Sequence, residues 1–504
     1  MKAFLLHRER DFDWDTKLPK NADDLIQDLG LQTLFDAMAG EDRVIPTVAP
    51  KVVLGGLRDV DALLYRQAVL RDCLAHREIV REIYALAEEA ITEERRSFWG
   101  LTSRYPSTIL RRGRDILPMF LAILKRMRLI AEAHADWFAS DGFRRFFSML
   151  ETELEDDYLA KVDGLLKTVE FPDGILMSVR LGKGNHGTDY VLREFVRPNK
   201  NWIERILPPA EDGLTYHIPP RDESGMRALS ELGDRGINLV ADALGQSTEH
   251  ILAFFTTLRS ELAFYLGCVN LQEQLTAKGE PTCFPAISPA GARIRDGANL
   301  YDACLSLLAK ERIVGNDAAA DGKSMIVITG ANRGGKSTFL RSLGIAQLMM
   351  ECGMFVPANS YRASLSSGVF THYKREEDAS MESGKFDEEL KRMNDMVAEL
   401  SPNAFVLFNE SFAATNDREG SEIARQIAEA LVDSGVEVAF VTHLYEFAHR
   451  LWVERKDTTL FLRAPRSDDG ERSFRLAEEE PLPTSYGEDI YYRVFGEAAQ
   501  FLKS

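Results

Sequence analysis

The feature that most constrains this sequence is the run of residues 330–337, which fits the pattern GxxxxGK[ST]. Its glycines let consecutive backbone N–H groups turn inward around a phosphate at the N-terminus of a helix. In such a loop Lys336 places its charge against the β- and γ-phosphate oxygens, and the Ser337 hydroxyl is a ligand for Mg²⁺. The sequence therefore predicts a site for a nucleoside triphosphate with Mg²⁺. The residues expected to hold the nucleotide are Gly330, Ala331, Asn332, Arg333, Gly334, Gly335, Lys336, Ser337 and Thr338.

The segments around this run agree with that interpretation. Met325–Thr329 before it has the apolar character of a strand, and Phe339–Met350 after it continues as a helix. The other strands expected in this part of the chain are Ala404–Phe408, Val436–Thr442, Thr458–Arg463 and Arg472–Leu476. The first two alternate with helical segments, which predicts a parallel sheet with flanking helices. The last two are expected to form an added β-hairpin.

An amide and a carboxyl group follow the apolar strand Ala404–Phe408. Asn409 stands where an aspartate usually helps to hold Mg²⁺, so we expect it to be a metal ligand together with Ser337. Glu410 is the carboxylate that we expect to polarise the attacking water. The competing interpretation is a strand that simply ends in solvent.

Two further polar positions are candidates for contact with phosphate. His443 follows the strand Val436–Thr442, and we expect that strand to bring it to the same sheet edge, where it can contact the γ-phosphate or hold the attacking water. The alternative is a structural histidine. Ser383 and Gly384 open a helix that runs toward Leu400, and free N–H groups at such a start can bind an anion. A helix cap with no other role fits the sequence equally well.

The first half of the chain is different in pattern. Apolar residues recur at three- and four-residue steps in Asp59–Ile91, Ile116–His134, Phe143–Leu166 and Met226–Leu275, which predicts long helices that pack on one another. Between them, Ile175–Leu181 and Tyr190–Val196 are expected to be strands. The basic residues of this insert are Arg180, Lys183, Arg193, Arg197, Lys200, Arg205 and Arg221. The insert is therefore either a solvated hairpin or a tip that contacts phosphate.

Composition limits the remaining possibilities. A chain of 504 residues exceeds one ordinary core, so two to four domains are expected. Its 61 basic and 79 acidic residues give a net charge of −18, which disfavours indiscriminate coating of nucleic acid. The five cysteines form no CxxC pair, and we expect reduced thiols in a cytoplasmic protein. We expect neither a membrane span nor a secretory signal.

The motifs resemble those of the ATPase domain of the MutS family of DNA mismatch-repair proteins, which is itself similar to ABC-type ATPases. The resemblance covers roughly residues 286–497. The segments that carry it are Ile328–Thr338, Phe370-Thr371, Asn409-Glu410, Thr415, Gly420, Val441–His443 and Ser485–Gly487. In the helical part, Tyr65–Gln67 and Phe254–Leu275 resemble the core and lever helices of the same family.

The resemblance implies a multidomain protein. Residues 1–285 would form a helical core and lever domain with a β-rich insert at about 170–221, and residues 286–504 an α/β P-loop ATPase domain of the ABC-like type. It also implies ATP as the nucleotide, DNA as a partner and a homodimer through the ATPase domains. Lys336, Glu410 and His443 would then be the catalytic residues.

Departures from the family pattern limit what the resemblance implies. The sequence ahead of residue 50 has no room for the mismatch-reading domain, so branched or otherwise unusual DNA is expected rather than a mismatch. Gly384 and Lys385 stand where relatives carry a Ser-Thr-Phe segment that completes the partner's site. Residues 411–414 replace a Gly-Arg-Gly-rich stretch. Two hypotheses follow: an ATPase that opens and closes a clamp on DNA, and a nucleotide-gated scaffold for a protein partner with slow or no hydrolysis.

Overall fold

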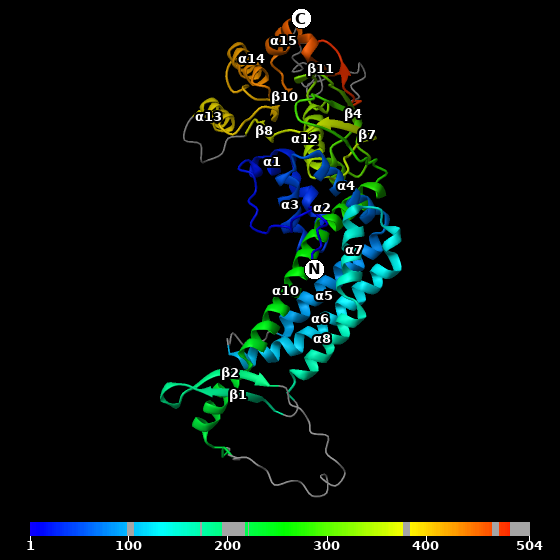
Figure 1. Cartoon of the computed structure of the whole chain (residues 1–504). Coiled ribbons are helices and arrows are strands. Elements are labelled where there is room, and N and C mark those ends of the chain that lie inside the picture. Colours follow the sequence, from blue (N-terminus) through cyan, green and yellow to red (C-terminus); the bar gives the residue numbers. More distant parts are fainter. Residues whose placement is uncertain are drawn as a thin grey trace, which may run out of the picture. The chain divides into compact units, whose positions relative to one another are not determined.

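The computed structural model (Figure 1) describes residues 1–97, 105–171, 174–193, 217–219, 221–375, 384–465 and 473–483. The chain divides into two compact units. The first consists of Met1–Phe4, Glu78–Ala139 and Phe143–Arg259, and the second of Leu5–Arg77, Ser140–Gly142 and Ser260–Ser504. The expected domain boundary between residues 285 and 286 stays a prediction, and the compact units follow different limits.

The first unit is mainly helical. Its helices are α5 (Arg77–Ser97), α6 (Pro106–His134), α7 (Asp141–Glu153), α8 (Asp156–Thr168) and the N-terminal part of α10 (Glu223–Ala277). The expected helical periodicity of Asp59–Ile91 is present, but it is divided at His76 between α4 (Val60–Ala75) and α5. Phe143, Phe146 and Phe147 are buried against one another and against Phe138. The apolar stripe of α7 and the preceding Phe138 therefore form a buried aromatic cluster.

Helix α10 is 55 residues long, and by length and composition alone one window of it could cross a membrane. The sequence was expected to contain no such stretch. Because 72% of that window is buried within the protein, its apolar side chains are already used in packing. A mostly buried core helix passes the same test of length and composition.

The insert contains an antiparallel hairpin close to the expected positions, although both strands begin at other residues than expected. Strand β1 (Leu176–Leu181) pairs with β2 (Gly187–Arg193), so Leu181 lies opposite Gly187 and Leu176 opposite Arg193. The second strand begins three residues earlier than expected, because Gly187 already takes part in the ladder. Most side chains of β1 are exposed. The basic residues Arg197, Lys200 and Arg205 lie outside the described residues.

The second unit contains a sheet of six strands in the order β12-β11-β6-β10-β9-β8. Five are parallel: β6 (Met325–Gly330), β8 (Val369–Tyr373), β9 (Phe405–Asn409), β10 (Glu437–Val441) and β11 (Thr459–Ala464). The expected parallel sheet is therefore present. β12 (Ala477–Glu478) pairs antiparallel with β11, one residue beyond the segment expected to form the second strand of that hairpin.

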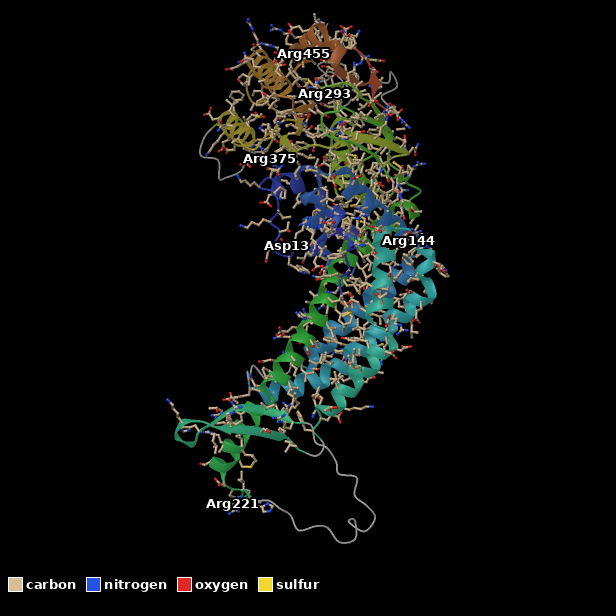
Figure 2. The ribbon with its side chains drawn as sticks, in the orientation of Figure 1. Asp13, Arg144, Arg221, Arg293, Arg375 and Arg455 are labelled. Atoms are coloured by element: carbon tan, nitrogen blue, oxygen red, sulfur yellow. The ribbon has the colours of Figure 1, made fainter. Side chains whose placement is uncertain are left out.

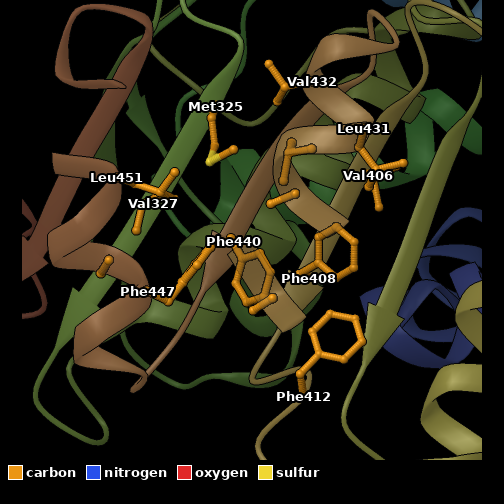
Figure 3. Packing of buried hydrophobic residues seen from close by; sticks show 14 of the residues in the cluster. Met325, Val327, Val406, Phe408, Phe412, Leu431, Val432, Phe440, Phe447 and Leu451 are labelled. Atoms are coloured by element: carbon orange, nitrogen blue, oxygen red, sulfur yellow. The ribbon is translucent and has the colours of Figure 1, made fainter. Parts of the chain in front are cut away.

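Helices cover both faces of this sheet. Side chains of Val327, Val406 and Phe408 pack with α14 (Asp417–Asp433) and α15 (Tyr445–Arg455) in one buried cluster, part of which is drawn in Figure 3. Alternate side chains of a strand point to opposite faces, and Leu407 accordingly lies against Gly344 of α12 (Lys336–Glu351). Helix α13 (Lys385–Val397) lies beside β8.

The second unit also contains elements that were not expected beside the sheet. A four-stranded sheet has the order β3-β7-β4-β5, formed by β3 (Ala286–Ser288), β4 (Arg295–Leu300), β5 (Asn316–Ala319) and β7 (Ser360–Ser364). The short helix α11 (Ala303–Leu308) follows β4. Three N-terminal helices, α1 (Ala22–Leu29), α2 (Leu31–Ala39) and α3 (Ile45–Gly55), belong to the same unit. Arg375, labelled in Figure 2, forms ion pairs with Asp24 and Asp28 of α1.

Candidate functional site

The run 330–337 forms the connection between β6 and α12, as the motif predicts. Gly330 has φ +107° and Gly335 has φ +91°, a left-handed backbone that favours glycine. A Cβ atom on Gly330 would lie 2.5 Å from the carbonyl oxygen of Ala464. The loop therefore lies tightly against the end of β11, and a side chain at position 330 would displace backbone. Gly335 is the N-cap of α12, so the loop meets the positive end of that helix.

Lys336 is held inside this loop. Its side chain is 4% exposed, and its Nζ donates to the carbonyl oxygens of Gly330 and Ala331, both at 3.0 Å. The ammonium group is thus buried among backbone carbonyl oxygens at the start of α12. An anion at the loop would therefore meet a preorganised cation.

Ser337 and Asn409 are brought together from positions 72 residues apart in the chain. The Ser337 hydroxyl donates to Oδ1 of Asn409 over 2.8 Å. Both side chains can offer oxygen to Mg²⁺, and both lie where a strand or loop ends at the same sheet edge. Within the described residues there is no group of three or more His, Cys, Asp or Glu side chains that could hold a metal. A metal ion here would thus depend on these two oxygens and on the phosphates of its nucleotide.

Glu410 and His443 form the second contact at this edge. Nε2 of His443 lies 2.9 Å from Oε1 of Glu410, and both side chains are a little more than one-third exposed. The hydrogen bond from His443 lowers the pKa of Glu410, burial opposes that shift, and the charges of Lys336 and Lys374 assist it. Glu410 is therefore a carboxylate at neutral pH, which is the form that can accept a proton from water.

The other loop residues that were expected to hold the nucleotide lie in or next to the loop. Asn332 and Arg333 are exposed, Gly334 is buried beside Ala464, and Thr338 lies in the first turn of α12. These positions agree with a loop wrapped around an anion, and the nucleotide-binding role of each residue stays a prediction.

A cavity of about 400 Å³ opens beside the loop. Arg333, Gly335 and Thr338 line one side of it, and it also contacts Val314 and Phe474. The Asn316 amide donates to the carbonyl oxygen of Phe474 and holds that segment in place. A mixed aromatic and aliphatic wall next to a phosphate loop suits a planar base. Sequence reasoning did not identify Val314, Asn316 or Phe474, because they come from the start of β5, from the residues just before it, and from a segment more than 130 residues beyond the loop.

Three other residues near Glu410 were also missed. His372 on β8, Glu389 on α13 and Ser411 are buried and bonded to one another around the backbone that follows Glu410. The signals available in the sequence were the position of His372 directly after Phe370-Thr371 and the departure from the family pattern at residues 411–414.

Two expectations fall partly outside the described residues. Ser383 and Ser485–Gly487 are not among them. Gly384 is the N-cap of α13 and has an extended backbone, and no side chain caps this helix start. Whether an anion binds there stays a prediction.

The five cysteines are all free. Burial raises the pKa of the thiols that are enclosed in the core, and it takes those of Cys304 and Cys352 to about 12. Such thiols remain protonated and unreactive at neutral pH.

Comparison with known proteins identifies the class to which this fold and site belong. The family model described as MutS2 N-terminal domain matches residues 58–278, and the model described as MutS domain V matches residues 326–490. The chain belongs to the MutS family. The second match contains the phosphate loop, Asn409-Glu410 and His443, and the first contains helices α4 to α10 but not α1 to α3.

Named relatives agree with this assignment. The chain is 32% identical to "Endonuclease MutS2" of Lacticaseibacillus casei over 224 residues, which cover 42% of the chain and 28% of the relative. It is 29% identical to "DNA mismatch repair protein MutS" of Chloroflexus aurantiacus over 183 residues, 33% of the chain and 19% of the relative. The protein of that name from Shouchella clausii is 23% identical over 494 residues, 87% of the chain and 54% of the relative. The chain thus spans less than a third of the length of the first two relatives.

Proposed function

We propose that this chain is a Mg²⁺-dependent ATPase of the MutS type, in which ATP binding and hydrolysis drive a clamp-like change that controls its hold on DNA. The observation that carries the proposal is the meeting of three motifs at one sheet edge. Ser337 of the phosphate loop donates to Asn409 at the end of β9, and Glu410 after β9 contacts His443 after β10. These are the groups that phosphoryl transfer to water requires.

Each group has a distinct task in the proposed reaction. Lys336 neutralises charge that develops on the β- and γ-phosphate oxygens. Ser337 and Asn409 would hold Mg²⁺, which supplies further charge neutralisation and orients the phosphates. Glu410 accepts a proton from the attacking water, while His443 holds the carboxylate in its orientation and keeps it ionised.

DNA is the proposed partner, and a homodimer through the ATPase domains is the proposed assembly. The support is family membership together with relatives whose names refer to DNA mismatch repair and to an endonuclease. We infer action in the cytoplasm, in DNA repair or recombination, on branched or otherwise unusual DNA. Affinity for homoduplex, mismatched and branched DNA, measured with and without ATP, tests both the partner and its dependence on nucleotide.

A second candidate is a nucleotide-gated scaffold that binds a protein and hydrolyses ATP slowly or not at all. It is favoured by Asn409, which lacks the charge of the usual aspartate, and by the net charge of −18. The two candidates differ in turnover and in DNA affinity, which are both measurable on the full chain.

Two substitutions test the proposed ATPase. Lys336→Ala is expected to abolish ATP binding, because it removes the buried charge of the loop. Glu410→Gln is expected to keep ATP bound and to lower kcat by roughly 10²–10⁴-fold, because an amide cannot accept the proton. Titration calorimetry and steady-state phosphate release measure the two effects.

Glu446→Gln is the matched control for Glu410→Gln, since Glu446 is an exposed glutamate on the neighbouring α15. It should leave binding and turnover unchanged. Equal turnover in the parent and in Glu410→Gln would remove Glu410 from the reaction, and unchanged ATP affinity in Lys336→Ala would refute the phosphate site.

A further inference from the structure

The backbone that follows the proposed catalytic carboxylate has an unusual conformation. Glu410 has φ +56° and Phe412 has φ +65°, so two residues with side chains occupy the left-handed region within three positions. This region is costly for residues other than glycine and persists only where the surroundings hold it. On its N-terminal side Glu410 is held by its own N–H, which donates to the carbonyl oxygen of Val441. Other contacts must hold the C-terminal side.

Ser411 supplies the first of these contacts. Its side chain is fully buried, and its hydroxyl donates to the carbonyl oxygen of His372 over 2.6 Å. The same Oγ lies 2.9 Å from Nδ1 of the His372 ring. One serine is therefore bonded to both the backbone and the side chain of a single residue of β8. This arrangement fixes residue 411 relative to the sheet.

Glu389 of α13 supplies the second contact. Its Oε1 accepts the backbone N–H of Phe412 over 2.7 Å, and its own carbonyl oxygen lies 3.2 Å from Nε2 of His372. The ring of Phe412 stacks on the imidazole at 5.4 Å with an interplanar angle of 18°. The backbone that follows Glu410 is thus bonded to β8 through Ser411 and to α13 through the N–H of Phe412.

The link between the His372 ring and Ser411 does not depend on which ring nitrogen carries the hydrogen. Burial and the charges of Arg392 and Arg375 lower the pKa of His372 to about 4, so its ring is neutral at pH 7 and carries one hydrogen. If Nδ1 carries it, that nitrogen donates to Ser411, whose hydroxyl donates to the carbonyl oxygen of His372. If Nε2 carries it, the ring donates to the carbonyl oxygen of Glu389, and Nδ1 accepts the serine hydrogen. The link between the ring and Ser411 exists in both cases.

We propose that Ser411, His372 and Glu389 are positioning residues for the ATPase reaction. They hold the left-handed backbone that aims the Glu410 carboxylate at His443, and they connect that carboxylate to α13. A movement of α13 would therefore displace the backbone next to Glu410, because Glu389 of α13 is bonded to the N–H of Phe412. The inference rests on the proposed function, and it adds residues that do not touch the nucleotide.

The test compares alanine substitutions at two buried serines, and it compares two different substitutions at Glu389. Ser411→Ala removes the hydroxyl that bonds to His372. Ser421→Ala is its matched control, because Ser421 is buried on α14 and its Oγ has no hydrogen-bond partner. Glu389→Met removes the acceptor for Phe412, whereas Glu389→Gln keeps an oxygen there. The kcat for phosphate release and the Kd for ATP are measured for each variant, with circular dichroism as the check on folding.

The expected result is a separation of turnover from binding. Ser411→Ala and Glu389→Met should lower kcat by about tenfold or more, since a small misplacement of a reacting group is costly. Their Kd for ATP should stay within about twofold of the parent. Glu389→Gln should restore most of the kcat lost in Glu389→Met, and Ser421→Ala should match the parent. A purely structural role would not produce this pattern.

Three outcomes would overturn the inference. If the parent hydrolyses ATP and both Ser411→Ala and Glu389→Met have the kcat of the parent, the positioning role is refuted and the ATPase proposal stands. Equal losses in Glu389→Gln and Glu389→Met would show that the oxygen at position 389 does not matter. Absence of turnover in the parent would refute the ATPase proposal and this inference together. If Ser411→Ala fails to fold, the pair at Glu389 decides.

Discussion

Asn409 occupies the end of β9, where its Oδ1 accepts the hydrogen of the Ser337 hydroxyl. An amide preserves this hydrogen bond but contributes no negative charge beside a divalent ion. Unit charges about 4 Å apart interact by about 4 kcal/mol at an effective dielectric of about 20. Hydration of the ion and the charge of the triphosphate offset most of that loss. The expected consequence is weakened Mg²⁺ binding rather than an inactive site.

Asn409→Asp tests this expectation. The variant should lower the half-saturating Mg²⁺ concentration for ATP turnover by about tenfold, because it restores a carboxylate beside the ion. Steady-state ATPase assays across a Mg²⁺ series on both proteins measure the effect. Asn394→Asp adds the same charge at an exposed position of α13 and should change nothing. A parent without turnover at any Mg²⁺ concentration would instead favour the scaffold.

At the scale of elements, the β1–β2 hairpin of the first unit carries exposed basic side chains. Arg180 is 80% exposed and pairs with Asp189 at 3.4 Å, and Nε of Arg193 donates to Ser178. Lys183 lies in the turn between the strands. Exposed basic side chains on a two-stranded ribbon can reach a nucleic-acid backbone without disturbing the helical core.

Replacing Lys183 and Arg193 with alanine is therefore expected to weaken DNA binding. The slope of log affinity against log salt should become shallower by up to about 1.8, since each neutralised phosphate contributes about 0.9 for duplex DNA. Gel-shift titrations at several salt concentrations measure both quantities. The matched control replaces Arg144 and Lys161, which are exposed on α7 and α8; Arg144 is labelled in Figure 2. If both pairs of substitutions change the DNA affinity and the salt slope equally, only the net charge of the protein matters for binding.

At the scale of the whole chain, the N-terminal segment is attached to Glu261, which lies 249 to 256 positions further along the chain. Glu261 on α10 accepts the backbone N–H groups of Leu5, Leu6 and Phe12. Arg66 donates to the carbonyl oxygens of Leu6 and of Cys352, which follows the last residue of α12. The start of the chain and the C-terminal end of the phosphate-loop helix therefore share one buried arginine.

This attachment predicts a dependence of stability on pH. Burial raises the pKa of Glu261 from 4.5 to about 7, against the opposing effect of the three N–H bonds. The folded protein then binds a proton that the unfolded chain has released between pH 4.5 and 7. The contribution of Glu261 to the free energy of unfolding is fully present below pH 4.5 and is lost as the pH rises through about 7. The free energy of unfolding should fall over this window by up to about 3 kcal/mol.

Chemical denaturation of the parent and of Glu261→Gln across pH 4.5 to 8 measures this contribution. The difference between the two proteins should change with pH, because glutamine keeps an acceptor but does not titrate. Glu249→Gln, at an exposed position of the same helix, should parallel the parent at every pH. A pH-independent difference for Glu261→Gln would show that its carboxyl group titrates near the ordinary pKa.

The sequence by itself determined the local features of this protein. A motif such as residues 330–337 requires a strand before it and a helix after it, and the apolar runs that follow have the length and composition of buried strands. Period-3.6 patterns likewise indicated the long helices of the first half. These features depend on neighbours within about twenty positions, which the sequence displays directly. β2 begins three residues before the expected strand, and β12 begins only after the end of the expected segment Arg472–Leu476, because pairing decides where a strand begins.

Only the tertiary structure decided which distant residues meet. The four-stranded sheet combines segments from Ala286 to Ser364 in an order that no local pattern contains. The association of α1–α3 with the rest of the second unit likewise depends on contacts such as those of Arg375 with Asp24 and Asp28. The bonds of Ser411 with His372 and of Glu389 with Phe412 join residues 23 to 39 positions apart. Such contacts follow from packing and from the burial of polar groups that must find partners, and neither is visible in a linear pattern.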